Sequence, residues 1–348
     1  MASIGLSEST TISSEASPRP VMSRPDLWSF LVPQPNAIRG PLRLNTADVD
    51  EINRVFSDAF TERYHRDGMT GVRVPPLNPA IWRFALAAAS DGALHWRDAE
   101  GHLAAFNIVH TLGHEGWMGP LAVRPDCQGR GLGRRIVQAG VDLLKANGCR
   151  VIGLETMPRT VDNIGFYSGM GFRPAHMTVS VTRETHGAAG MPGELASRLG
   201  PPGAWIERLR ELVTEVMPGL DVGREAGLTL EQALGDVTVV RDGNHWRAAA
   251  LWHAAPLALG RPADELRVLK LVAKDRGAFR AVVQALVAEA AARGLGRVAI
   301  RCQTGFREAY GDLMEMGFRV HWTDLRMVLA DRPEVAPRTG VVFSNWEI

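Results

Sequence analysis

The sequence predicts a mixed α/β (α+β) protein with two similar domains in tandem, each a central mixed β-sheet flanked by helices. Three observations lead to this prediction. Strand-like and helix-like stretches alternate along the chain. The chain has 348 residues, a length that suits two domains of about 100–200 residues each. The sequence also matches itself at an offset of 146 residues.

The internal repeat is the strongest of the three observations. In one register, Arg130, Gly131, Arg134, Val137, Gln138, Ala139, Val141 and Gly148 fall on Arg276, Gly277, Arg280, Val283, Gln284, Ala285, Val287 and Gly294. The run MGFR at 170–173 falls on an identical run at 316–319 in the same register. Two matching clusters in one register predict that both halves have the same fold.

Composition divides the chain into four segments. Residues 1–38 form a Ser/Thr/Pro-rich N-terminal tail that we expect to be partly disordered, with the apolar side chains of Trp28, Phe30 and Leu31 docked on the protein. Residues 186–203 are rich in Gly and Pro and predict a linker. The expected domains are therefore residues 39–185 and residues 204–348.

Within the first domain the pattern predicts the elements in order. Asn78 opens the second helix because an Asn side chain can cap free backbone N–H groups. The long helix after residue 131 buries an apolar stripe and ends at Asn147–Gly148. The expected elements are a strand at 41–44, a helix from Thr46 or Asp48, the helix from Asn78, a hairpin of strands 93–96 and 103–110, a strand at 117–123, the long helix, a strand at 151–154, a helix at 161–170 and a strand at 177–181. At the other end of the chain, 340–348 is expected to insert as a strand into a sheet.

Composition excludes several classes of function. Lys+Arg (39) nearly balance Asp+Glu (38), which argues against a nucleic-acid or membrane-surface partner. The three cysteines, with no CxxC pair, argue against a disulfide scaffold or a zinc site, and no metal is expected. No apolar run is long enough to span a bilayer and the N-terminus has no secretory h-region, so we expect a cytoplasmic protein.

The stretch LAVRPDCQGRGLGRRIV at 121–137 is the motif that carries chemistry. Its glycines allow backbone N–H groups to crowd into one concavity at a helix N-terminus, which suits a phosphate or pyrophosphate. Arg130, Arg134 and Arg135 can add charge-assisted hydrogen bonds. The loop lacks the GK[ST] ending of a Walker A motif and has GxGxG rather than GxGxxG spacing.

A second motif, NIGFYSGMGF at 163–172, follows about forty residues later. The pair of motifs resembles the GNAT-type N-acyltransferases, whose pattern is V-x-P-x-x-[QR]-G-x-G-x-[GA] followed by N…FY…GF. The resemblance covers about residues 39–184 well and the second half more loosely. The matching residues are Val123, Pro125, Gln128, Gly129, Gly131 and Gly133 in the first motif, and Asn163, Phe166, Tyr167, Gly171 and Phe172 in the second.

The resemblance implies a single site for acetyl-CoA, the acyl donor, with its pyrophosphate on residues 128–134 and its pantetheine arm along 118–123. Tyr167 would protonate the departing thiolate, whose pKa near 8.5 is close enough to that of a phenol near 10 for proton transfer. The alternative is that Tyr167 is an aromatic residue of the core. The expected cofactor-binding residues are Leu121, Ala122, Val123, Gln128, Gly129, Arg130, Gly131, Leu132, Gly133, Arg134, Asn163 and Tyr167.

An amine acceptor must lose a proton before it attacks, because at a pKa near 10.4 only about one part in two thousand is neutral at pH 7. Residues 118–121 (MGPL) cannot titrate, so the strand ahead of the loop offers no base. Glu155, at the end of the next strand, is the leading candidate for the base, followed by His110 and His114. The segment 61–79 is expected to shape the acceptor pocket.

The second half departs from the motif. Gln128, Gly129, Gly133, Asn163 and Tyr167 fall opposite Lys274, Asp275, Phe279, Ala309 and Leu313. A negative charge beside a pyrophosphate and a bulky side chain in the loop predict that this copy keeps the fold and has lost the cofactor. It is expected to pair with the first copy and to wall the acceptor site.

The function predicted from these residues is an N-acetyltransferase that moves an acetyl group from acetyl-CoA to an amine of a small molecule or peptide by direct attack. Two alternatives stay open: a non-catalytic acyl-CoA-binding or sensing module, and a scaffold without CoA binding. A monomer and a homodimer are both compatible with the sequence, since an internal repeat supplies contacts that a homodimer otherwise would.

Overall fold

The computed structural model describes residues 38–187 and 190–345. The predicted docking of Trp28, Phe30 and Leu31 falls outside these residues, as does Trp346 at the end of the expected C-terminal strand. None of the described helices is both long and apolar enough to cross a bilayer.

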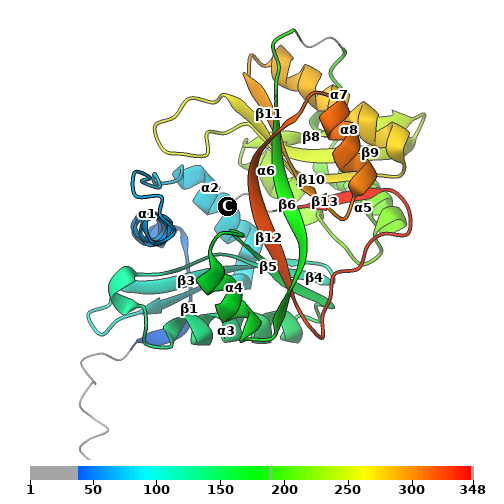
Figure 1. Cartoon of the computed structure of the whole chain (residues 1–348). Coiled ribbons are helices and arrows are strands. Elements are labelled where there is room, and N and C mark those ends of the chain that lie inside the picture. The colour runs from blue at the N-terminus through cyan, green and yellow to red at the C-terminus, as the bar shows by residue number, and fades with distance from the viewer. Residues whose placement is uncertain (1–37, 188–189, 346–348) are drawn as a thin grey trace, which may run out of the picture.

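The first half contains six strands and four α-helices among the described residues (Figure 1). Asn78 caps α2 as expected, since its side chain accepts a hydrogen bond from the N–H of Ala80. The elements are β1 (Arg39–Arg43), α1 (Val49–Arg66), α2 (Pro79–Ala89), β2 (Ala93–Arg97), β3 (Leu103–Leu112), β4 (Glu115–Val123), α3 (Leu132–Ala146), β5 (Val151–Thr156), α4 (Val161–Ser168) and β6 (Phe172–Glu184). The elements predicted in this half are confirmed, with β6 longer at both ends than the expected 177–181.

The second half repeats this order and adds one strand at its end. Its elements are β7 (Glu194–Leu195), α5 (Pro202–Val216), α6 (Gly223–Glu231), β8 (Gly235–Asp242), β9 (His245–His253), β10 (Glu265–Ala273), α7 (Arg276–Ala292), β11 (Arg297–Gln303), α8 (Arg307–Glu315), β12 (Arg319–Leu329) and β13 (Val341–Ser344). Short 3-10 helices lie at Thr46–Asp48, Ser90–Gly92, Pro125–Cys127 and Ala196–Arg198. The offset of 146 places α3, β5, α4 and β6 on α7, β11, α8 and β12, so the element order confirms the repeat.

The predicted linker at 186–203 contains structured residues. Glu194 and Leu195 form β7, which pairs with β8, and α5 begins at Pro202. The boundaries at 185 and 204 remain predictions.

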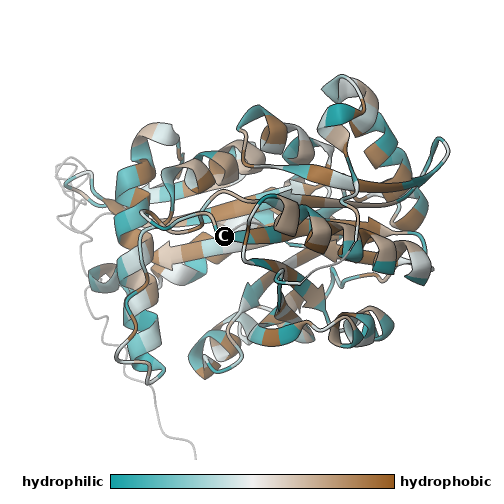
Figure 2. Ribbon diagram, turned by 90° about the horizontal axis from the view of Figure 1, so that it is seen from above, coloured by the Kyte–Doolittle hydropathy of each residue, from teal (hydrophilic) through white to brown (hydrophobic). Residues whose placement is uncertain are grey.

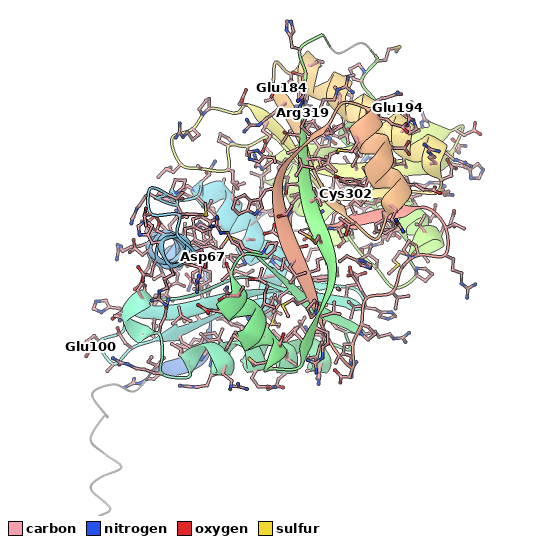
Figure 3. The ribbon with its side chains drawn as sticks, in the orientation of Figure 1. Asp67, Glu100, Glu184, Glu194, Cys302 and Arg319 are labelled. Atoms are coloured by element: carbon pink, nitrogen blue, oxygen red, sulfur yellow. The ribbon has the colours of Figure 1, made fainter. Side chains whose placement is uncertain are left out.

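The two halves share one 13-stranded mixed sheet rather than having separate sheets. Its order is β1-β2-β3-β4-β5-β12-β6-β11-β10-β9-β8-β7, with β13 paired to β10. Each half thus gives its last long strand to the other: β12 lies between β5 and β6, and β6 pairs with β11. Figure 1 shows β6 and β12 side by side at the centre of the molecule, and Figure 3 labels Glu184 and Arg319 at the same end of the two strands.

Helices cover both faces of the sheet (Figure 2). In the first half, one apolar core lies between α1, α2 and the sheet, and another lies between α3, α4 and the opposite face. In the second half, α5 and α6 cover one face and α7 and α8 cover the other. The core under α5 and α6 reaches Phe84 of α2 and Trp117 of β4, so apolar packing as well as strand pairing joins the halves.

Candidate active site

A cavity of about 610 Å³ opens in the first half where two parallel strands part. β4 pairs with β5 from Glu115 to Met118, and beyond Met118 it continues to Val123 with β3 as its partner. The β5-facing edge of β4 is therefore free along the cavity. A volume of this size falls in the usual range for small-molecule sites.

The glycine loop forms the wall at one end of the cavity. Gly129 and Gly131 both have a φ of +76°, a left-handed conformation that favours glycine. The N–H of Arg135 makes the first bond of α3, to the carbonyl of Gly131, so the preceding N–H groups at 132–134 have no helical acceptor. Gln128 closes the turn, because its side-chain Nε2 donates to the carbonyl of Val123 at 2.9 Å. Free N–H groups at a helix N-terminus suit a phosphate group.

The structure brings most of the predicted site residues together. Those that line the cavity are Leu121, Ala122, Val123, Gln128, Gly129, Gly131, Gly133, Arg134, Asn163, Tyr167 and Glu155. Two predicted side chains are elsewhere: Arg130 is exposed outside the cavity, and Leu132 is buried against α3 core residues such as Ile136. For these two residues only the backbone belongs to the loop.

Tyr167 stands on α4 among aromatic rings. Its ring packs edge-on against Phe166 and Phe172, with centroids 5.1 and 6.1 Å away. Burial raises the pKa of the Tyr167 hydroxyl to about 12. The hydroxyl is therefore protonated at neutral pH, as a proton donor must be.

Glu155 lines the cavity but is held by three donors. Arg301 of β11 forms an ion pair with Oε2, Arg326 of β12 donates to Oε1 at 2.9 Å, and the Thr178 hydroxyl also donates to Oε1. Burial raises the pKa of Glu155, but the two guanidinium groups and the Thr178 hydroxyl outweigh burial and hold it below its ordinary value. A carboxylate so occupied is a weak proton acceptor, and the role of Glu155 as the base remains a prediction.

The two histidines considered as alternative bases do not line the cavity. His110 is buried, its Nε2 lies 3.1 Å from the carbonyl of Gly119, and burial lowers its pKa to about 4. His114 is exposed at the turn between β3 and β4, where its backbone N–H donates to Gly219 at 2.6 Å.

Three further residues line the cavity, and two of them come from the second half. Tyr64 belongs to α1, whereas Trp322 and Asp324 belong to β12. The segment 61–79 was expected to shape the acceptor pocket, and residues 62–64 and 66 of it line the cavity. Asp67, labelled in Figure 3, follows at the end of α1. Its side chain accepts a hydrogen bond from the Thr160 hydroxyl ahead of α4.

In the second half, the position equivalent to the cavity is occupied by a strand of the protein itself. β10 parts from β11 after Val268, and β13 pairs with β10 at Lys270–Ala273, along the edge that is free in β4 (Figure 1). The expected strand at 340–348 is thus confirmed for Val341–Ser344. Asp275 caps α7 by accepting a hydrogen bond from the N–H of Ala278 at 2.9 Å. The ring of Phe343 on β13 packs 5.7 Å from that of Phe279.

Residues 50–172 match the model of the acetyltransferase (GNAT) family. Two curated relatives align with part of the chain. The mycothiol acetyltransferase of Clavibacter michiganensis is 34% identical over 87 residues, which are 25% of this chain and 28% of that protein. The [ribosomal protein bS18]-alanine N-acetyltransferase of Salmonella typhimurium is 34% identical over 77 residues, 22% of this chain and 52% of that protein. The alignments thus span about a quarter to a half of these relatives.

Two solved structures resemble the whole chain in fold. A putative acetyltransferase from Pyrococcus horikoshii has a TM-score of 0.65 and 14% identity, and the match covers 90% of this chain and 95% of that one. A tandem GNAT protein from the clavulanic acid biosynthesis pathway has a TM-score of 0.57 and 14% identity, and the match covers 86% and 100%. At this identity the likeness concerns the fold, and it extends over both halves.

Proposed function

We propose that the chain, whose residues 50–172 match the acetyltransferase (GNAT) family, moves an acetyl group from acetyl-CoA to an amine of a small molecule or peptide. One observation carries the proposal. The free N–H groups at the start of α3, the free edge of β4 and the hydroxyl-bearing Tyr167 all border the same cavity. These are the parts needed to hold a pyrophosphate, a pantetheine arm and a departing thiolate.

Donor binding divides between the loop and the strand. The N–H groups of 129–134 would bind the pyrophosphate, with the guanidinium of Arg134 adding charge at the same end. The free backbone edge of β4 would pair with the amides of the pantetheine arm, as an added strand does. Backbone N–H groups of β4 near the thioester would stabilise the negative charge that develops on its carbonyl oxygen.

The transfer we propose is a direct attack. The lone pair of the neutral amine forms the new C–N bond, the C–S bond breaks, and the sulfur takes the proton of the Tyr167 hydroxyl. An acceptor that binds as ammonium first gives one proton to water to become the neutral amine. After the attack a second proton leaves the nitrogen and, through water, reprotonates Tyr167, so the products from the ammonium form are the acetylamide, CoA as its thiol and one released proton. The three cysteines are buried and do not line the cavity, which agrees with direct attack rather than a covalent enzyme intermediate.

We assign the activity to one site per chain. In the second half the Asp275 carboxylate occupies the N-terminus of α7, and β13 occupies the edge of β10. Both donor-binding features are therefore already used by the protein itself. The proposal gives this half a structural role and a share in the wall of the first site.

A non-catalytic acyl-CoA-binding module is the second candidate. It is favoured by the occupied carboxylate of Glu155 and by the absence of a titratable side chain at 118–121. The two candidates differ in turnover rather than in binding.

One experiment separates them. Thermal unfolding with acetyl-CoA, CoA, ATP and NAD in parallel is expected to show stabilisation by the CoA species alone, by about 2.7 kcal/mol at a hundredfold excess over Kd. Thiol release is then measured with acetyl-CoA across a panel of amines. Release above the amine-free rate supports the enzyme. Stabilisation without release across the panel supports the binding module, and no stabilisation by a CoA species contradicts both.

A further inference from the structure

Resting on the proposed function, we propose that the second half supplies the acceptor-binding carboxylate: the ammonium group of a cationic amine binds at Asp324, beside the rings of Tyr64 and Trp322. This assigns the acceptor class as amines without a carboxylate next to the nitrogen. It also gives the second half a direct part in the reaction of the first.

Strand exchange places Asp324 in the site. β12 pairs with β5, so Asp324 reaches the cavity one strand away from Glu155. On the neighbouring strand β6 its Cα partner is Thr178. Without this exchange, β12 would lie in the sheet of the second half.

Asp324 has capacity for a further hydrogen bond, in contrast to Glu155. Its Oδ1 accepts from the indole N–H of Trp322 at 3.2 Å and its Oδ2 accepts from Arg301 at 2.9 Å. A carboxylate offers about four acceptor positions, so two remain. The Asp324 side chain is 16% exposed, whereas that of Glu155 is 6% exposed and has three donors. Of the two carboxylates, Asp324 is the one open to a ligand.

Two aromatic rings complete the site. The rings of Tyr64 and Trp322 meet edge-on with centroids 6.4 Å apart, and both line the cavity. Aromatic faces attract a cation within about 6 Å of the ring centre, and Trp and Tyr do so more strongly than Phe. The Asp324 charge and these rings favour the same kind of ligand.

The other charges at this end of the cavity reinforce that preference. Arg63 forms ion pairs with Asp67 and Asp162, and Arg66 forms one with Glu62. Among the described lining residues, three carboxylates (Glu62, Glu155 and Asp324) and two guanidinium groups (Arg63 and Arg66) border this end. Each of these groups has an ion-pair partner, so neither guanidinium is left over for an acceptor carboxylate. A carboxylate beside the acceptor nitrogen would meet Asp324 with the same sign of charge, which raises the free energy of binding.

The test compares matched acceptors on the full-length protein. Phenethylamine and phenylalaninamide carry a cation without a carboxylate, whereas phenylalanine adds one. We expect kcat/KM for the first two to exceed that for phenylalanine by about tenfold or more. A wider panel of alkyl and aralkyl amines, each with its carboxylated counterpart, extends the comparison.

Variants identify the residue. Asp324→Asn is expected to lower kcat/KM for the amine by tenfold or more while the KM for acetyl-CoA stays unchanged. Tyr64→Leu leaves the Arg301 ion pairs intact and is expected to raise the amine KM. Asp331→Asn, an exposed carboxylate in the same half that pairs with Lys145, is the matched control.

The outcomes separate the two proposals. If Asp324→Asn and Tyr64→Leu both acetylate the amine at the wild-type rate, this inference is overturned and the proposed function stands. The same holds if the wild-type protein prefers phenylalanine to the amines without a carboxylate. Acetyl-CoA binding without acetylation across the panel overturns the proposed function, and the inference with it.

Discussion

Glu155 at the end of β5 forms an ion pair with Arg301 of β11, and this pair joins the two halves of the chain inside the protein. The Glu155 side chain is 6% exposed. Arg326 of β12 binds the same carboxylate from the other side, and its guanidinium lies 3.8 Å from the ring centre of Trp117 in the first half. The charges beneath the cavity therefore come from both halves.

The first prediction concerns Glu155→Gln. The change leaves Arg301 and Arg326 with less compensating charge in a buried place, so the free energy of unfolding should fall by about 3–5 kcal/mol. Chemical denaturation measures this loss. The matched control is Glu211→Gln, which removes an exposed carboxylate that pairs with Arg208 at 3.4 Å and should cost less than about 1 kcal/mol.

The same carboxylate makes stability sensitive to acid. Because its neighbours hold the Glu155 pKa below the ordinary value of about 4.3, its contribution is complete above that pH. The contribution is lost as the pH falls through the folded-state pKa. In Glu155→Gln, the free energy of unfolding should therefore depend less on pH in this acidic range. If Glu155→Gln instead keeps the wild-type free energy of unfolding and its kcat no longer depends on pH, Glu155 is the base.

The second prediction concerns Tyr167→Phe. Removing the proposed proton donor should lower the rate of acetyl transfer by about 10²–10⁴-fold, because the thiolate must then leave unprotonated. The KM for acetyl-CoA should change little, since the ring keeps its packing against Phe166 and Phe172. Tyr310→Phe on α8 removes a hydroxyl from a tyrosine that does not line the cavity, and it is the matched control. Wild-type rates for Tyr167→Phe would make Tyr167 an aromatic residue of the core.

The third prediction is a pH dependence set by Asp324. Burial and the nearby Glu155 charge raise its pKa above the ordinary value, against the opposing effects of Arg301 and the Trp322 N–H. The charge of Asp324 in turn raises the pKa of Tyr64, after burial. Since the ammonium binds the ionised form, kcat/KM for the amine should fall as the pH drops through that raised pKa. Asp324→Asn should abolish this fall in kcat/KM at low pH. An identical fall in the variant would refute the assignment.

Much of the first half could be predicted because local sequence determines it. The cap at Asn78, the apolar stripe of α3 and the glycines at 129 and 131 each act within a few residues, and the structure shows each as expected. The repeat predicted one fold for both halves, and its register places β5, α4 and β6 on β11, α8 and β12.

The exchange of β6 and β12 could not be predicted in the same way. Both strands have similar patterns, and a pattern shows which face is buried but does not identify the partner strand. Trp322 and Asp324 were missed for this reason: the second copy was expected to wall the acceptor site, but the sequence did not show which of its residues would reach the cavity. One signal was present: in the repeat register Asp324 falls on Thr178 and Trp322 on His176, so the second copy differs from the first at both positions.

The binding stoichiometry of CoA tests the central claim, that one site in the first half holds the donor. Isothermal titration of the full-length protein should give one CoA per chain. Gly131→Val places a β-branched side chain at a φ of +76° and should abolish binding. Gly277→Val, the repeat-equivalent change at the start of α7, should leave it intact. Two CoA molecules per chain, or binding lost in Gly277→Val and kept in Gly131→Val, would contradict the account.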